Sequence, residues 1–178
     1  MQLKRVKSDP RPASDILFTP AIDLENAKAE ILALKSQAIE KERNVDVLTF
    51  SHVICRPTEE EALQYWDYAA RTNADWTAVE NVIKMQFANC YSFPHEVLHL
   101  LRERFASGHG GFPLVGTPEQ VADGITALAE VGFKGTTLSF VDYNDEFPYF
   151  RDHVLPILTE RRLRGDGNRN SSSLNISK

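Results

Sequence analysis

Three runs of apolar and β-branched residues alternate with stretches of helical spacing, and this alternation limits what the chain can fold into. The runs cover residues 16–19, 45–54 and 138–141. Strands that alternate with helices indicate an α/β fold, and parallel strands need long crossover connections of this kind. We therefore expect a parallel sheet of three strands, of which the first two are buried.

Capping residues mark where several of the helices begin. Asp23 precedes apolar residues that recur at helical spacing. Thr58 is followed three positions later by Glu61, and Thr117 by Gln120. This spacing is typical of a capping box, in which each side chain satisfies a backbone N–H of the first turn. We expect helices over residues 23–38, from 59 to beyond 76, between 79 and 105 with interruptions, from 118, and from about 148 to 163.

The length of the chain sets a second limit. A closed eight-stranded barrel takes typically about 250 residues, whereas this chain has 178. We expect one domain over residues 14–164, preceded by a flexible N-terminal segment, residues 1–13. A disordered tail is expected at residues 165–178, because its Gly, Asn and Ser residues cannot bury enough apolar surface to order it.

Charge and composition argue against several classes of function. The net charge of -5 is unsuited to nucleic acid, whose phosphates need a concentrated basic surface. No apolar run approaches the roughly 18 residues of a membrane span, and no apolar leader follows the polar N-terminus. We expect a cytoplasmic protein without nucleic-acid or membrane partners. Cys55 and Cys90 form no C-x-x-C pair. The sequence leaves open whether a single disulfide joins them.

Several segments, in their order along the chain, resemble a known family. They are residues 47–58, the P-L-V-G-T-P-E-Q-V-A sequence at 113–122, Gly132-Phe133 with the run 136–140, and residues 150–158. Together they resemble the C-terminal part of the luciferase-like flavin-dependent monooxygenases, the family of bacterial luciferase. The branch that acts on organosulfur compounds is the most similar, as in dimethylsulfone and alkanesulfonate monooxygenases.

The resemblance implies a fold, a cofactor and partners. The fold would be α/β, a partial TIM (β/α)8 barrel with about the last three βα units. The cofactor would be reduced FMN, supplied by a separate flavin reductase and used with O2 to oxidise a small organosulfur substrate. The chain would be a truncated form of the enzyme and a homo-oligomer, with its site at the carboxyl ends of the strands.

His52 is the catalytic residue that the resemblance implies, with Phe50 in the substrate site. The two side chains share a face of the strand 45–54, because side chains alternate along a strand. Relatives similar to alkanesulfonate monooxygenase carry an arginine and a histidine at these positions. Phe50 replaces the arginine, which predicts a less charged substrate. An imidazole at this place can donate a hydrogen bond or orient a substrate. The alternative is a structural histidine with satisfied hydrogen bonds.

The remaining predicted site residues follow from the same resemblance. The glycine-rich loop at residues 107–112 matches the loop that closes over the flavin, so His109, Gly110 and Gly111 are predicted to bind cofactor. Thr19, after the first strand, is predicted to do the same, and Tyr143, after the last, to bind substrate. A plain surface loop is the alternative for each.

Two other functions stay open. His95, Glu96 and His99 form the H-E-x-x-H pattern of zinc proteases, which places two histidines on one helical face. Pro94 puts His95 in the first helical turn, however, and the H-x-x-G-x-x-H extension is absent. We therefore expect no metal site. The other possibility is a non-catalytic remnant or interaction module with the same fold.

Overall fold

The computed structural model of the chain describes residues 15–87 and 95–165, apart from the side chains of residues 86–87 and 95–100. The predicted flexible segment 1–13 and nearly all of the predicted tail 165–178 lie outside this part. The elements, in chain order, are β1 (Ile16–Phe18), α1 (Leu24–Ile39), β2 (Asp46–Cys55), α2 (Glu59–Asp67), the π-helical turn η1 (Tyr68–Thr72), α3 (Trp76–Phe87), α4 (His95–Gly108), β3 (Phe112–Gly116), α5 (Pro118–Glu130), β4 (Gly135–Ser139), α6 (Tyr143–His153) and α7 (Leu155–Glu160).

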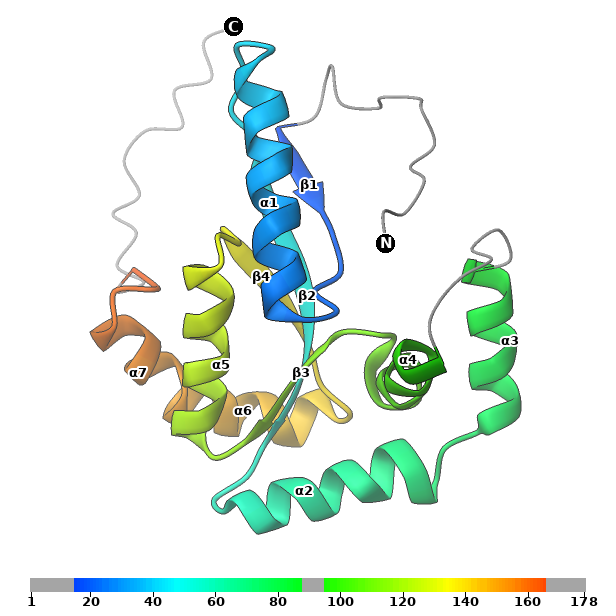
Figure 1. Cartoon of the computed structure of the whole chain (residues 1–178). Helices are drawn as coiled ribbons and strands as arrows, with labels where there is room; N and C mark the ends of the chain where they lie inside the picture. The colour runs from blue at the N-terminus through cyan, green and yellow to red at the C-terminus, as the bar shows by residue number, and fades with distance from the viewer. Residues whose placement is uncertain (1–14, 88–94, 166–178) are drawn as a thin grey trace, which may run out of the picture.

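The sheet is parallel and centred on β2, as the alternation of strands and helices predicts. β1 pairs with Asp46–Leu48, β4 with Leu48–His52, and β3 with Ser51–Cys55. Leu48 therefore has partners in both β1 and β4, and His52 in both β3 and β4. Because a strand has two edges, β1 and β3 must follow one another along one edge of β2, with β4 on the other (Figure 1).

The prediction of three strands is wrong, because the sheet has a fourth, β3. Pro113 and Gly116 hide this strand in the sequence, since both residues weaken a strand pattern. Proline is tolerated where one side of a strand lacks a partner, and among the described residues β3 pairs with β2 alone.

The prediction that the first strand is buried is also wrong. β1 exposes Ile16 by 55% and Phe18 by 59%, and Leu17 between them is half-buried. One face of β1 is therefore open.

The two faces of β2 have different surroundings. Val47 packs with α1 and α5 residues, while Val53 and Cys55 pack with residues of α5, α6 and α7. The alternate residues of β2 point to the opposite face, where Leu48 and Phe50 are half-buried and His52 is fully buried. α4 contacts β2 on this second face, through Gly108. The sheet thus has one face covered by helices and one covered only near the carboxyl end of β2.

The helix caps confirm the sequence predictions at three places. Asp23 accepts from the backbone N–H of Asn26, and Thr58 accepts from that of Glu61. Thr117 and Gln120 form the reciprocal capping box at the start of α5. Each cap satisfies a backbone donor that the first helical turn would otherwise leave without a partner.

Two predicted helices have different bounds. The helix expected to run from residue 59 past Trp76 ends at Asp67, passes through the π-turn η1 and restarts at Trp76. The Asn73 side chain donates to the carbonyl of Tyr68, and the Asp75 side chain accepts from the N–H of Ala78. Short polar side chains thus compete with the helix backbone there. The final helix begins at Tyr143 rather than near residue 148, and it breaks at Val154 before α7.

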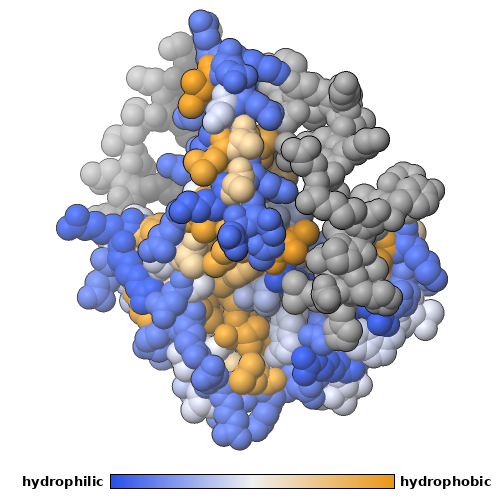
Figure 2. Space-filling view, viewed as in Figure 1, coloured by the Kyte–Doolittle hydropathy of each residue, from blue (hydrophilic) through white to orange (hydrophobic). Residues whose placement is uncertain are grey.

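Apolar side chains also reach the surface on the helix-covered face. α1 exposes Leu32 and Ile39, and Figure 2 shows apolar residues gathered down the middle of the side on which α1 lies. None of the helices described is both long and apolar enough to cross a membrane.

Candidate functional site

His52 lies at the centre of the candidate site. It is paired in register with Ser139 of β4, so the two side chains point to the same face of the sheet. The His52 Nδ1 atom lies 3.1 Å from the Ser139 Oγ atom, and the same hydroxyl donates to the carbonyl of Ser51 at 3.3 Å. The other ring nitrogen, Nε2, is buried and has no hydrogen-bond partner within the described part of the chain.

The surroundings of His52 favour the neutral form of its imidazole. The side chain is only 1% exposed, and this burial lowers its pKa, because a low-dielectric environment disfavours the charged ring. The negative charge of Glu146 opposes the shift but is the smaller cause. The Trp66 ring from α2 lies 6.4 Å from the imidazole, centroid to centroid. A buried neutral histidine with one bare nitrogen can accept a proton or a hydrogen bond.

The glycine-rich loop packs directly on His52. A Cβ atom at Gly108 would lie 2.2 Å from the His52 Cγ atom, and one at Gly111 would lie 3.1 Å from the His52 backbone nitrogen. Only glycine permits approaches this close. Gly110 has a φ of 82° and its N–H donates to the carbonyl of Arg104. Of the predicted cofactor-binding glycines, Gly111 therefore lies beside His52, whereas Gly110 lies against the Phe105 ring.

Arg104 connects this loop to the end of β1. Its guanidinium is buried and donates to the carbonyls of Ala21 and Ile22, at 3.0 and 2.9 Å. Burial lowers the pKa of Arg104, and Asp23 opposes that shift. The N–H of Thr19 donates to the Leu48 carbonyl, so Thr19 lies at the end of β1 on the same connection. α4 and the loop after β1 are thus held together.

A second polar group lies where β2 ends. Arg56 donates to Glu146 at 2.7 Å and to the carbonyl of Cys55, and its guanidinium lies 4.0 Å from the centre of the Tyr65 ring. Glu146 is buried, and its second oxygen accepts from the N–H of Asp142. Burial, with the Glu146 charge as a smaller cause, raises the pKa of Tyr65. This group joins the carboxyl end of β2 to the start of α6.

The other predicted site residues have surroundings of their own. Phe50 shares the face of His52 and is half-buried. Tyr143 is exposed, its hydroxyl donates to the carbonyl of Leu138 at 3.4 Å, and its ring meets Phe140 edge-on. His109 is exposed, has a φ of 56°, and its ring meets Phe105 edge-on. The structure thus brings His52 together with the glycine loop, while Tyr143 and His109 face outward.

Three residues of this site were missed by the sequence reasoning: Ser139, Trp66 and Glu146. Ser139 follows from the register of β2 and β4, which no local pattern encodes. Trp66 comes from α2, and its approach to His52 depends on how that helix packs on the sheet. Glu146 follows the capping residue Asp142 by four positions, but its burial depends on Arg56, which is distant in sequence.

The H-E-x-x-H pattern, which suggested a zinc site, lies where the structure does not describe side chains. The side chains of His95, Glu96 and His99 are not among those described, although α4 does begin at His95. Elsewhere in the described residues, no group of three or more His, Cys, Asp or Glu side chains is arranged to hold a metal ion.

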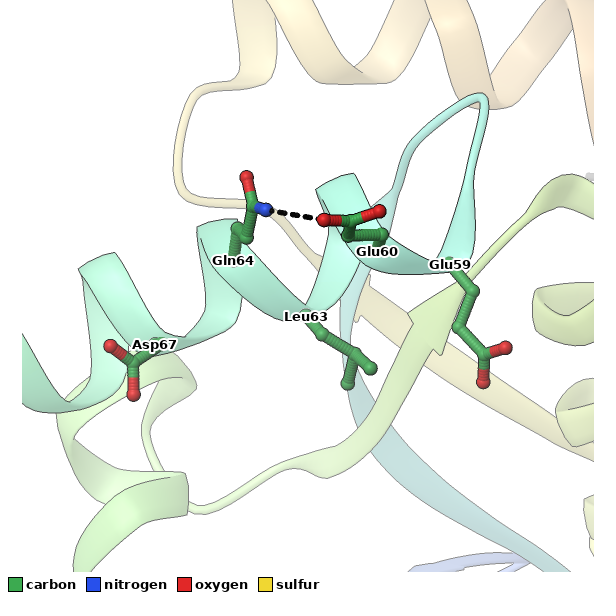
Figure 3. Close-up of a pocket in the computed structure, with 5 residues that line it drawn as sticks. All are labelled: Glu59, Glu60, Leu63, Gln64 and Asp67. Carbon is green, nitrogen blue, oxygen red and sulfur yellow. Dashed lines mark hydrogen bonds between the residues drawn. The ribbon is translucent and has the colours of Figure 1, made fainter.

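A surface hollow lies along α2, away from His52. Glu59, Glu60, Leu63, Gln64 and Asp67 line it, and Gln64 donates to Glu60 within it (Figure 3). It is open and lined by one helix, and none of the predicted site residues contributes to it. The hollow is therefore not the candidate site.

Comparison with known proteins identifies relatives over most of the chain. The chain is 28% identical over 165 residues to an FMNH2-dependent dimethylsulfone monooxygenase from Pseudomonas fluorescens (strain Pf0-1), which covers 88% of this chain and 44% of that protein. It is 30% identical over 152 residues to a protein with the same name from Pseudomonas putida, covering 83% and 42%. The chain thus spans less than half the length of these relatives. No family model matches.

Solved structures agree on the fold. DmoA from Hyphomicrobium sulfonivorans superposes with a TM-score of 0.71 at 20% identity, over 85% of this chain and 38% of that one. Riboflavin lyase (RcaE) superposes with a TM-score of 0.68 at 23% identity, over 86% and 40%. Neighbours of this kind have the luciferase-like TIM-barrel fold. Together with the sequence relatives, they show that the chain is similar, over most of its length, to part of the luciferase-like flavin-dependent monooxygenases.

Proposed function

We propose that the chain supplies part of the active site of an FMN-dependent monooxygenase, which uses reduced flavin and O2 to oxidise a small organosulfur substrate. In this proposal the four-stranded sheet is part of a TIM barrel, and a separate flavin reductase provides the reduced FMN. The relatives named as dimethylsulfone monooxygenases support the substrate class. The replacement of a family arginine by Phe50 supports an uncharged substrate such as a sulfone.

The observation that carries the proposal is the buried, unpartnered Nε2 atom of His52. A buried polar atom without a partner costs stability, and a catalytic role or a bound ligand is one explanation for such an atom. This one lies on the sheet face opposite the helix-covered face, beside the glycine loop that packs through Gly108 and Gly111. A ligand that donates a hydrogen bond would satisfy it.

The residues present fit a flavin ring but not its phosphate. Leu48 and Phe50 form an apolar surface next to His52, which suits a flat aromatic ring, and His52 supplies an acceptor. Arg56 and Arg104, the two arginines beside the site, are committed to Glu146 and to backbone carbonyls. We therefore assign only the ring to this part of the chain. Bound reduced FMN would supply the electrons that activate O2.

Within the chain, each group has a defined task in the proposal. His52 would accept a hydrogen bond from the ligand and hold its orientation. The loop at Gly108–Gly111 would exclude water from this contact, since its glycines allow the backbone to lie against the imidazole. Because His52 is already covered by Gly108, admission of a ligand requires α4 to move away first.

An interaction module is the second candidate, and the open sheet face favours it. Ile16 and Phe18 are both more than half exposed on the face that carries Phe50 and His52. Exposed apolar side chains that share a face often mark a contact surface. In this reading the chain completes a barrel with further strands but performs no chemistry of its own.

Oxygen transfer separates the two candidates. The purified chain is incubated with reduced FMN, dimethyl sulfone and ¹⁸O-labelled dioxygen, and products are analysed by mass spectrometry. The proposal predicts an oxidised product that carries one labelled oxygen atom, and its loss in His52→Gln. His153→Gln is the matched control, because His153 lies exposed on α6 and should leave the product unchanged. Absence of labelled product, with flavin binding that His52→Gln leaves unchanged, would favour the interaction module.

A further inference from the structure

We propose that Ser139 is a positioning residue, which holds His52 in the tautomer with its proton on Nδ1 and leaves Nε2 as a hydrogen-bond acceptor. A neutral imidazole carries one proton on one of its two nitrogens, and the partner of one nitrogen fixes the state of the other. Ser139 is the partner here. The tautomer is a property of this chain, while its value for catalysis rests on the proposed function.

The distances around the Ser139 hydroxyl carry the argument. Its oxygen lies 3.1 Å from His52 Nδ1 and 3.3 Å from the carbonyl oxygen of Ser51. A hydroxyl has one proton to donate and lone pairs to accept with. The carbonyl of Ser51 can only accept, whereas Nδ1 can donate or accept, so both hydrogen bonds form together only when the hydroxyl proton points to Ser51. The lone pair then faces Nδ1, which must carry the proton of the imidazole to complete the bond.

The hydrogen bond to Ser139 favours this ring orientation over the flipped one. Turning the imidazole by half a rotation would set a carbon, Cδ2, against the Ser139 oxygen and remove the hydrogen bond. Gly108 lies against the Cβ, Cγ and Nδ1 atoms of His52, and Ser139 comes from the neighbouring strand in register with it. The ring is therefore held from both sides, and Nε2 points away from Ser139.

The neutral state that this tautomer requires is supported by burial. The pKa of His52 lies below its ordinary value because the ring is desolvated, and the Glu146 charge only partly offsets this. The neutral ring leaves Nε2 bare when its proton is on Nδ1. In this tautomer the Nε2 atom accepts a hydrogen bond from an N–H or O–H group and does not donate one. The ligand that binds there must therefore present a donor to His52.

Nuclear magnetic resonance tests the tautomer directly. Protonated and bare imidazole nitrogens have widely separated ¹⁵N shifts, and the couplings to the ring protons tell Nδ1 from Nε2. The spectrum is recorded on the ¹⁵N-labelled full chain above pH 7, without flavin, and His52→Gln identifies the signals of His52 by their loss. We expect a protonated Nδ1 and a bare Nε2. A protonated Nε2 in the unmodified chain would overturn the proposal.

Variants at Ser139 separate positioning from packing. Ser139→Ala removes the hydroxyl and should shift the His52 population toward the Nε2–H tautomer. Ser139→Thr keeps a hydroxyl and should restore the Nδ1–H form. Thermal unfolding of each variant reports its stability separately. If Ser139→Ala folds and keeps the Nδ1–H tautomer, Ser139 has no positioning role. Because flavin is absent throughout, this result is independent of whether the chain is a monooxygenase.

Discussion

Substitution of Gly108 by alanine tests the close contact between α4 and His52. The added Cβ atom would lie 2.2 Å from Cγ, 2.4 Å from Nδ1 and 2.5 Å from Cβ of His52. Real atoms do not approach this closely, so either the ring or the end of α4 must shift. The His52 ring is hydrogen-bonded to Ser139, and His52 lies on the central strand β2. We therefore expect α4 to be displaced.

Two opposing effects set the size of the change. Alanine is favoured over glycine in a helix by up to about 1 kcal/mol, while overpacking a well-filled site costs about 1–3 kcal/mol. The clash involves a ring held on two sides, so the cost lies toward the upper end of that range. The expected net loss in the free energy of unfolding is about 2 kcal/mol.

Urea and thermal unfolding measure this change. For a chain of this size, a loss of 1 kcal/mol lowers the melting temperature by about 2–4 °C. Gly135→Ala is the matched control, because its Cβ would meet only Leu48 Cδ2 at 3.9 Å, and a change within about 0.5 kcal/mol is expected. If Gly108→Ala is as stable as the unmodified chain, or more stable, the described contact with His52 does not exist.

Three further predictions concern charge and burial. Glu146→Gln should lower the free energy of unfolding by about 1–3 kcal/mol, because it breaks an ion pair in which Glu146 is buried and Arg56 is partly exposed. An unchanged free energy of unfolding in urea would contradict this. Burial raises the pKa of Cys55 to about 12, so Cys55 should resist iodoacetamide in the folded chain and react in urea; intact-mass analysis that finds both cysteines alkylated while the chain is folded would disagree. Burial depresses the pKa of His52 from its ordinary value of 6.5. As the pH falls, the unfolded chain therefore binds a proton at this residue at a higher pH than the folded chain does. The free energy of unfolding should therefore fall as the pH drops below about 6.5, and His52→Gln should reduce that slope; equal slopes would show that His52 is not the group responsible.

Local patterns predicted the elements that depend on nearby residues. The Thr117–Gln120 capping box spans three positions, so sequence alone placed the start of α5. The long β-branched run likewise indicated β2. β3 was missed because Pro113 and Gly116 argue against a strand, and its pairing with the end of β2 compensates for them. The break after Asp67 depends on short polar side chains that compete with the backbone.

The site was predicted only in part, because its key contacts are distant in sequence. His52 and the glycine loop were identified through the family resemblance, and the structure places them side by side. The partner of His52 depends on the register between β2 and β4, which the alternation of side chains does not define. The exposure of Ile16 and Phe18 depends on which strands lie opposite them, and the sequence of a single strand does not contain that information.

Anaerobic titration of the purified chain with reduced FMN, followed by flavin fluorescence, tests the central claim most directly. His52→Gln and the control His153→Gln are titrated in parallel, and the metal content is measured on the same samples. The account predicts saturable binding of one flavin per site, weakened by His52→Gln and unchanged by His153→Gln. Absence of saturable binding, or binding that is equal in both variants, would contradict a flavin site at His52.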